Sequence, residues 1–249
     1  PIGATIYADN KILAVLILIL KFMFYNFADK IIAISKKSEK SLKKIVLLNK
    51  KIVLILNPYI DKILKIKKNK IKNKNKKFII LTVGRFTHQK NLFPIINVFI
   101  NLSKKYNQIE LNIIGDGNQK ISLIKKTKKY KNIRILNWKK NIKNYFLKSD
   151  LFILNSFYEG LPNVLIDAVN YEIPCISSDV SGARDILING KGGYLIPIND
   201  PYNLEKKIEY VMNNYSEAQK KAKYARGKIE NFGKKNLLIF YKEFIKLAK

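Results

Sequence analysis

The sequence predicts an α/β fold, a Rossmann-like parallel sheet with helices on both faces. Two observations support this prediction. Short segments such as Phe78–Val83 and Leu151–Leu154 are apolar at nearly every position, which is typical of strands buried on both faces. These segments alternate with amphipathic segments of helical length along most of the 249 residues, and such alternation favours βαβ units.

Six strands are expected in the second part of the chain, with helices between them and after them. The expected strands are Phe78–Val83, Glu110–Ile114, Ile133–Leu136, Leu151–Leu154, Pro174–Ser177 and Gly193–Ile196. The expected intervening helices are Asn91–Tyr106, Asn118–Tyr130, Ile142–Lys148, Pro162–Tyr171 and Ala183–Ile188. The expected closing helices are Pro201–Asn213, Ser216–Asn231 and Lys235–Lys249.

The first part of the chain is expected to hold a strand at Ala28–Ser35, a helix at Lys36–Leu48 and a strand at Ile52–Leu56. Before them, Ile12–Ala28 is an apolar run of 17 residues interrupted by Lys21 and Asn26. A membrane span needs about 20 apolar residues, so a buried or interfacial helix is favoured over a span. No signal peptide is recognised, and the chain is read as a fragment.

Composition narrows the classes of function. The only cysteine, Cys175, lies in an apolar run, so we expect a buried thiol in a reducing compartment. The formal net charge of +30 is typical of nucleic-acid or anionic-membrane binding. Lys, Asn and Ile are abundant together everywhere, however, and no basic run alternates with stacking aromatic residues. We therefore expect no nucleic-acid partner, while peripheral contact with an anionic membrane stays open.

Ligands of parallel sheets bind at the carboxyl ends of the strands, so the loops after the strands are the expected place for a ligand site. The loop GRFTHQKN begins at Gly84, which allows a tight exit from the strand. Arg85 supplies a planar fork of donors and Lys90 a point charge, and together they suit a diphosphate. The alternative is a pair of solvated surface cations. His88 lies between them, and a lone loop histidine is more often solvent-exposed and inert.

Two further loops give weaker signals. GDGNQ, beginning at Gly115, matches part of a dinucleotide fingerprint but lacks the third glycine, and it is not a Walker loop. Trp138 follows another expected strand and could flank a base or simply pack.

The loop SFYEGLP places Glu159 just before an expected helix that starts at Pro162. The free backbone N–H groups of Asn163 and Val164 at this helix start could hold an anion. Asp167 follows about one and a half turns inside the helix. One acid for neutral hydroxyls, an amide cradle for phosphate and another acid further along would together suit a sugar nucleotide.

Four of these motifs, in this order, resemble family 4 of the glycosyltransferases, which have the GT-B fold and are also described as glycosyl transferases group 1. The motifs are GRF with QKN, IIGDG, SFYEGLPNVLIDA, and the stretch from IPCISSD through SGARDIL to GGYLIP. The resemblance runs from about Ala28 to the end of the chain.

The resemblance implies a role for each site residue. Arg85 and Lys90, beside Gly84, would grip the donor diphosphate. Glu159 would be the first acid of the family's E-x7-E pair, contact the donor sugar and act in catalysis. The backbone of Gly160, Asn163 and Val164 would meet sugar and phosphates.

Asp167 stands at the second acid, which normally binds the ribose hydroxyls. The family usually has Glu at this position, so the side chain here is shorter by one methylene.

The resemblance also implies a domain division. Residues 62–77 hold nine lysines and almost no apolar core, and they read as a linker. Residues 1–61 would be a remnant of the N-terminal, acceptor-side domain, and 78–230 the donor-binding domain. Residues 231–249 would form a C-terminal helix that packs back toward the N-terminal part.

The activity implied is that of a retaining glycosyltransferase using a nucleotide-sugar donor. The acceptor would be a glycan or a lipid-linked glycan for the cell surface. No Asp-x-Asp motif occurs, so no metal and no cofactor are expected. The alternative is a truncated chain that binds a nucleotide sugar or a partner without turnover. The expected location is cytoplasmic, open to peripheral contact at the inner face of the cell membrane.

Overall fold

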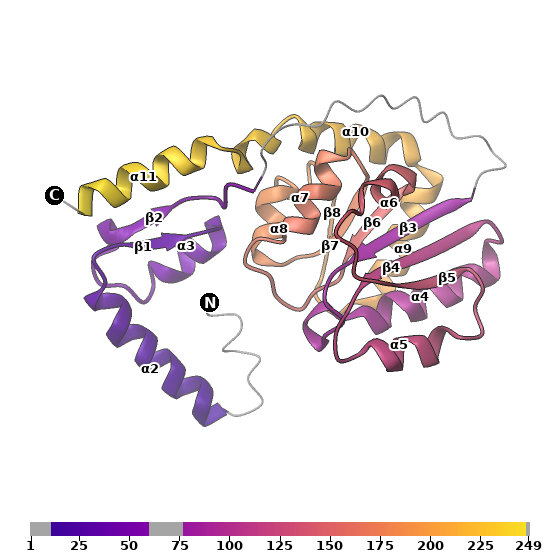
Figure 1. Ribbon diagram of the computed structural model, residues 1–249, viewed down its shortest axis with the longest axis horizontal. Helices are drawn as coiled ribbons and strands as arrows, with labels where there is room; N and C mark the ends of the chain where they lie inside the picture. The colour runs from indigo at the N-terminus through magenta and orange to yellow at the C-terminus, as the bar shows by residue number, and fades with distance from the viewer. Residues whose placement is uncertain (1–10, 60–76, 248–249) are drawn as a thin grey trace.

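The computed structural model describes residues 11–59 and 77–247 and contains one large α/β unit and one small unit (Figure 1). The large unit is a sheet of six parallel strands in the order β5-β4-β3-β6-β7-β8. These strands are β3 (Phe78–Val83), β4 (Ile109–Gly115), β5 (Ile133–Asn137), β6 (Leu151–Leu154), β7 (Cys175–Ser178) and β8 (Tyr194–Ile196). The predicted fold class is therefore confirmed.

Helices cover both faces of this sheet (Figure 1). They are α4 (Leu92–Lys105), α5 (Lys120–Thr127), α6 (Lys143–Lys148), α7 (Asn163–Asn170), α8 (Ser181–Ile186), α9 (Pro201–Asn213) and α10 (Tyr215–Arg226). Neighbouring residues of a strand enter different cores: Ile80 packs with α4 and α9, whereas Leu81 packs with α7 and α8. Both side chains are fully buried, which explains why the strands lack polar alternation.

The strand order has one reversal that matters for function. The chain crosses from β3 outward to β4 and β5, then returns to place β6 on the other side of β3. The loops after β3 and β6 therefore diverge from adjacent strands at the carboxyl edge of the sheet. Such a topological switch point is where open α/β sheets bind ligands.

The small unit comes first in the chain and contains the helix α2 (Lys11–Phe27) and a two-stranded parallel sheet. Its other elements are β1 (Ile31–Ala33), α3 (Lys36–Leu42), η1 (Asn49–Lys51) and β2 (Ile52–Leu54). Ala33, Val46 and Ile52 form its modest buried core. The expected helix Lys36–Leu48 ends six residues early, because the chain turns after Leu42 so that Val46 can enter this core.

The last helix, α11 (Lys235–Leu247), runs alongside the small sheet, not against the large one (Figure 1). Lys30 Nζ lies 3.4 Å from Glu243 Oε2, and the Asn236 side-chain amide donates to the Leu56 carbonyl at 2.8 Å. The helix expected at Ser216–Asn231 is divided near Gly227 into α10 and the short η3 (Ile229–Phe232).

Helix α2 forms where an apolar helix was expected, but it is not buried by the described residues. Ile12 is 81% and Phe24 is 66% exposed, and most of its other apolar side chains are also exposed. None of the helices in residues 11–59 and 77–247 combines the length and hydropathy needed to cross a bilayer. The expectation of a buried helix is thus not met within these residues, while an interfacial position stays a prediction.

Candidate functional site

The loop after β3 is anchored by Phe86, which follows Arg85 in the sequence and precedes the short η2 (His88–Lys90). Its side chain is completely buried. Its N–H donates to the Asp116 carbonyl at 2.7 Å, and its carbonyl accepts from the Gln119 N–H at 2.9 Å. A Cβ at Gly115 would lie 1.9 Å from the Gly84 carbonyl oxygen. The glycines of the GDG motif therefore serve a close approach between the loops after β3 and β4.

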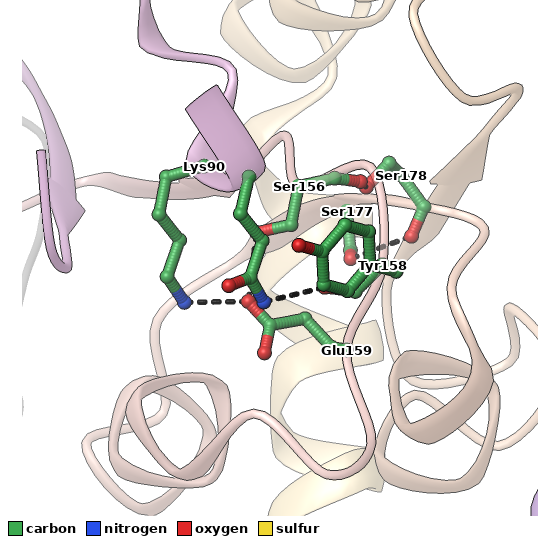
Figure 2. Close-up of polar contacts among 7 residues, drawn as sticks. Lys90, Ser156, Tyr158, Glu159, Ser177 and Ser178 are labelled. Carbon is green, nitrogen blue, oxygen red and sulfur yellow. Dashed lines mark hydrogen bonds and ion pairs between the residues drawn. The ribbon is translucent and has the colours of Figure 1, made fainter. Parts of the chain in front are cut away.

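Lys90 and Glu159 meet across the switch point (Figure 2). Lys90 Nζ lies 2.5 Å from Glu159 Oε1, and their side chains are 13% and 11% exposed. The Lys90 stem passes over Gly84, where an added Cβ would lie 3.2 Å from Lys90 Cε. The same Glu159 oxygen accepts from Ser156 Oγ at 2.8 Å. The structure thus brings a cation and an acid from two separate loops into one contact.

Backbone-directed hydrogen bonds fix the two loops to each other and to the sheet (Figure 2). The Gln89 side-chain amide donates to the Tyr158 carbonyl at 2.9 Å, and the Phe157 N–H donates to the Gln89 carbonyl at 2.9 Å. Ser178 Oγ, at the end of β7, donates to the Ser156 carbonyl at 2.6 Å. These bonds tie the loop of Glu159 to η2 and to the end of β7, and such anchoring is a requirement for a preorganised site.

No motif pointed to the supporting serines Ser156 and Ser178. Ser156 donates to the carboxylate of Glu159 on its own loop, and Ser178 donates to a backbone carbonyl of another loop.

Helix α8 packs closely against the segment that follows Glu159. A Cβ at Gly182 would lie 2.4 Å from the Gly160 carbonyl oxygen and 2.6 Å from Leu161 Cα. These neighbours are backbone atoms, which cannot move aside as a flexible side chain could. Gly182 therefore sets how near α8 comes to the loop of Glu159.

We expect Gly182→Ala to lower the free energy of unfolding by about 1–3 kcal/mol, as overpacking does. The expected control, Gly227→Ala, leaves stability within about 1 kcal/mol, because its added Cβ would meet nothing closer than 3.5 Å. Denaturant unfolding of both variants, followed by circular dichroism, tests this difference. Equal stabilities of the two variants would show that α8 can shift without consequence.

Asp167 lies one turn beyond Asn163 on α7 and is half-buried. Its Oδ2 accepts a hydrogen bond from the Tyr59 hydroxyl at 2.8 Å. Burial raises the pKa of Asp167, and the hydrogen bond from Tyr59 opposes that rise. No sequence motif pointed to Tyr59, which comes from the segment after β2.

The remaining predicted residues are placed as follows. Arg85 is exposed and forms no ion pair with an acid of the described residues. Asn163 and Val164 begin α7, so their N–H groups belong to its first turn, and α7 itself begins at Asn163, not at Pro162. Gly160 faces the small unit, where an added Cβ would lie 3.0 Å from Ile34 Cδ1. The functional roles of these residues stay predictions.

A cavity of about 370 Å³ lies between the large and small units. Glu159 and Gly160 line one wall, and residues 31–34 with the first turns of α3 line the other. The two units also touch directly, since the Lys36 N–H donates to Asp185 Oδ2 at 2.8 Å. Glu159 therefore pairs with Lys90 and also lines this cavity, most of whose other lining side chains are apolar.

The residues with weaker sequence signals differ in their surroundings. The His88 ring stacks on Phe157, a lining residue of the cavity, with centroids 4.8 Å apart. Trp138 is 68% exposed, so its packing interpretation is wrong. Cys175 is buried, as expected, and its thiol donates to the Ile173 carbonyl at 3.1 Å. Within residues 11–59 and 77–247, no group of His, Cys, Asp and Glu side chains is arranged to hold a metal ion.

The chain belongs to the glycosyl transferases group 1, a family of transferase enzymes, whose sequence profile matches residues 64–228. An uncharacterized glycosyltransferase of Methanocaldococcus jannaschii is 31% identical over 192 residues, 73% of this chain and 47% of that protein. The O-antigen biosynthesis glycosyltransferase WbnH of Escherichia coli is 31% identical over 232 residues, 91% of this chain and 64% of that protein. The chain thus spans less than two thirds of either relative.

Solved structures show the same fold. Sucrose-phosphate synthase from Thermosynechococcus elongatus superimposes with a TM-score of 0.81 at 17% identity, over 100% of this chain and 66% of that one. Anabaena HepE, solved in complex with UDP and glucose, gives a TM-score of 0.75 at 16% identity, over 93% of this chain and 66% of that one. At these identities the similarity supports the Rossmann-like GT-B arrangement and no more.

Proposed function

We propose that this chain binds a nucleotide sugar at the switch point and takes part in retaining glycosyl transfer to a glycan or lipid-linked acceptor. The observation that carries the proposal is the contact between Lys90 and Glu159 at the carboxyl edge of β3 and β6. A cation for phosphate and an acid for sugar hydroxyls stand side by side there. A nucleotide sugar presents both groups at adjacent positions.

The proposed chemistry uses this chain's own charges. Loss of the nucleoside diphosphate leaves negative charge on its phosphate oxygens, and donors already aimed at those oxygens stabilise the transition state. Lys90, Arg85 and the N–H groups of Asn163 and Val164 would supply these donors. Glu159 would accept hydrogen bonds from the donor sugar. We propose that these groups meet the charge of the diphosphate without a metal or another cofactor.

In this scheme Lys90 changes partners when the donor binds. In the structure Lys90 is paired with Glu159. The two opposite charges cancel, so this pair adds no net charge to the site. A diphosphate would draw Nζ away, and the sugar hydroxyls would take over the Glu159 oxygen. On donor binding, Lys90 would therefore exchange the Glu159 carboxylate for a phosphate, and Glu159 would exchange the Lys90 ammonium for sugar hydroxyls.

The relatives suggest the setting of the reaction. WbnH is named for O-antigen biosynthesis, and a Campylobacter jejuni relative, 28% identical over 218 residues, is named for transfer to a sugar-diphosphate-undecaprenol. We propose polysaccharide or glycoconjugate synthesis in the cytoplasm for this chain. The exposed apolar residues of α2 and the net charge of +30 support peripheral contact with an anionic membrane.

A second candidate is a chain that binds the nucleotide sugar without turnover. It is favoured by the small unit, which has only two strands in residues 11–59. Transfer needs donor and acceptor held in reacting geometry, and such positioning can supply roughly 7–11 kcal/mol of the barrier. Product formation from a nucleotide sugar and a lipid-linked glycan would exclude this candidate, whereas donor binding with no product would support it.

We expect Arg85→Ala to weaken nucleoside diphosphate binding by about 1.5–3 kcal/mol, the range for charge-assisted contacts. Because Arg85 is exposed and forms no ion pair with the described residues, its loss should leave stability unchanged. Isothermal titration with UDP, GDP and ADP measures the effect. Lys104→Ala, an exposed cation at the far end of α4, is the control and should bind as the wild type does. Undiminished binding by Arg85→Ala would remove this residue from the site.

A further inference from the structure

The segment that follows β2 lies along α7 and contacts it through two side chains. The Asn57 side-chain amide lies 3.5 Å from Asn163 Oδ1, and the Tyr59 hydroxyl donates to Asp167 Oδ2 at 2.8 Å. Asn163 and Asp167 are four residues apart, so both contacts fall on one face of α7. That face carries the second acid of the proposed donor site.

The segment itself is well anchored. Ile55 is buried, its N–H donates to the Ala33 carbonyl at 2.9 Å, and Leu56 packs against the core of the large unit. The Leu56 carbonyl also accepts from the Asn236 side chain at 2.8 Å. Tyr59 therefore reaches Asp167 from a fixed backbone, although its own side chain is 38% exposed.

The two oxygens of Asp167 are in different situations. Oδ2 accepts the Tyr59 hydroxyl, while Oδ1 has no hydrogen bond to any of the described residues. A carboxylate held at one oxygen has less torsional freedom to lose when the other oxygen binds a ligand. Burial raises the pKa of Asp167 and the Tyr59 hydrogen bond opposes this, so the bond also favours the ionised, hydrogen-bond-accepting form.

We propose that Tyr59 is a positioning residue for the nucleoside half of the donor, because it holds Asp167 through Oδ2 and leaves Oδ1 to accept a ribose hydroxyl. This inference rests on the proposed function. It also accounts for an aspartate at a position where the resemblance implies glutamate. The aspartate side chain is shorter than glutamate, and the hydrogen bond from Tyr59 holds its carboxylate in one orientation.

A competing interpretation gives the opposite sign. The Tyr59 hydroxyl could stand where a ribose hydroxyl would bind, and then it would block the site. Removing the hydroxyl would tighten nucleotide binding in that case, whereas it would weaken binding if Tyr59 positions the acid.

The test is Tyr59→Phe, which keeps the ring and removes only the hydroxyl. UDP, GDP and ADP are titrated by calorimetry, and inorganic pyrophosphate serves as a probe that lacks the nucleoside. We expect the affinity for the preferred nucleoside diphosphate to fall roughly three- to tenfold, the equivalent of one hydrogen bond, with pyrophosphate affinity unchanged. In an Asp167→Ala background, which leaves the Tyr59 hydroxyl no side-chain oxygen at this position, Tyr59→Phe should cause little further loss.

A rescue separates positioning from a merely structural role. Asp167→Glu in the Tyr59→Phe background restores reach without the tyrosine hydroxyl, and we expect it to recover most of the lost nucleoside affinity. Unchanged or tighter nucleoside diphosphate binding by Tyr59→Phe would overturn the inference, as would an equal loss for pyrophosphate. If the wild type bound pyrophosphate but none of the nucleoside diphosphates, the proposed function itself would fail, and the role of Tyr59 with it.

Discussion

Phe86→Ala is expected to lower the free energy of unfolding by about 3–5 kcal/mol, the usual cost of truncating a buried phenylalanine. Phe86 is completely buried, and its ring lies against Gly115, where an added Cβ would be 2.8 Å from Phe86 Cε1. The cavity left by truncation is bounded partly by backbone, which relaxes poorly. The loss should therefore lie near the upper end for its class.

The same substitution should also impair the site. Phe86 is the residue through which the loop of Arg85 and Lys90 is attached to the loop after β4. Once this anchor is loosened, we expect weaker UDP, GDP or ADP binding at a temperature where the variant is still folded. Urea unfolding and calorimetry measure the two effects. Phe244→Ala, at a side chain that is 62% exposed, is the control and should change neither. A Phe86→Ala variant as stable as this control would show that the loop is held by its backbone bonds alone.

Most of the large unit could be predicted from the sequence because its strands are buried on both faces. All four residues of Leu151–Leu154, for example, are buried, and such a continuous apolar run is typical of a central parallel strand. All six expected strands form. Because the strands are parallel and β3 is adjacent to β6, the loops that carry Arg85 and Glu159 lie at the same edge of the sheet. Helix ends were less predictable. Val46 is buried through a turn that helical periodicity alone would not reveal.

The contacts within the site could not be predicted to the same degree. The sequence assigned Lys90 to phosphate and Glu159 to sugar, but their mutual ion pair depends on how far each loop projects from its strand. The Tyr59–Asp167 contact depends on how the small unit is placed against α7. Both contacts join residues that are far apart in the sequence. The residues next to them in the chain therefore do not indicate that the contacts form.

Lys90→Met should reduce stability by about 3 kcal/mol, because it removes one partner of a largely buried ion pair and leaves the Glu159 carboxylate without its cation. Methionine retains an apolar stem over Gly84, so the loss reports charge more than packing. Ser156 still donates to Glu159, which keeps the expected loss at the low end for a broken buried pair. Thermal and urea unfolding measure the change.

Adding Glu159→Gln to Lys90→Met distinguishes the structural role of the pair from its proposed binding role. The double variant buries no unpaired charge, so we expect its stability to return to within about 1 kcal/mol of the wild type. Its affinity for pyrophosphate and for UDP, GDP or ADP should stay low, because the cation that would meet the diphosphate is still absent. Restored stability with restored binding would mean that Lys90 serves only to neutralise Glu159. Restored stability without binding would place Lys90 on the diphosphate, as the geometry of the two loops leads us to expect.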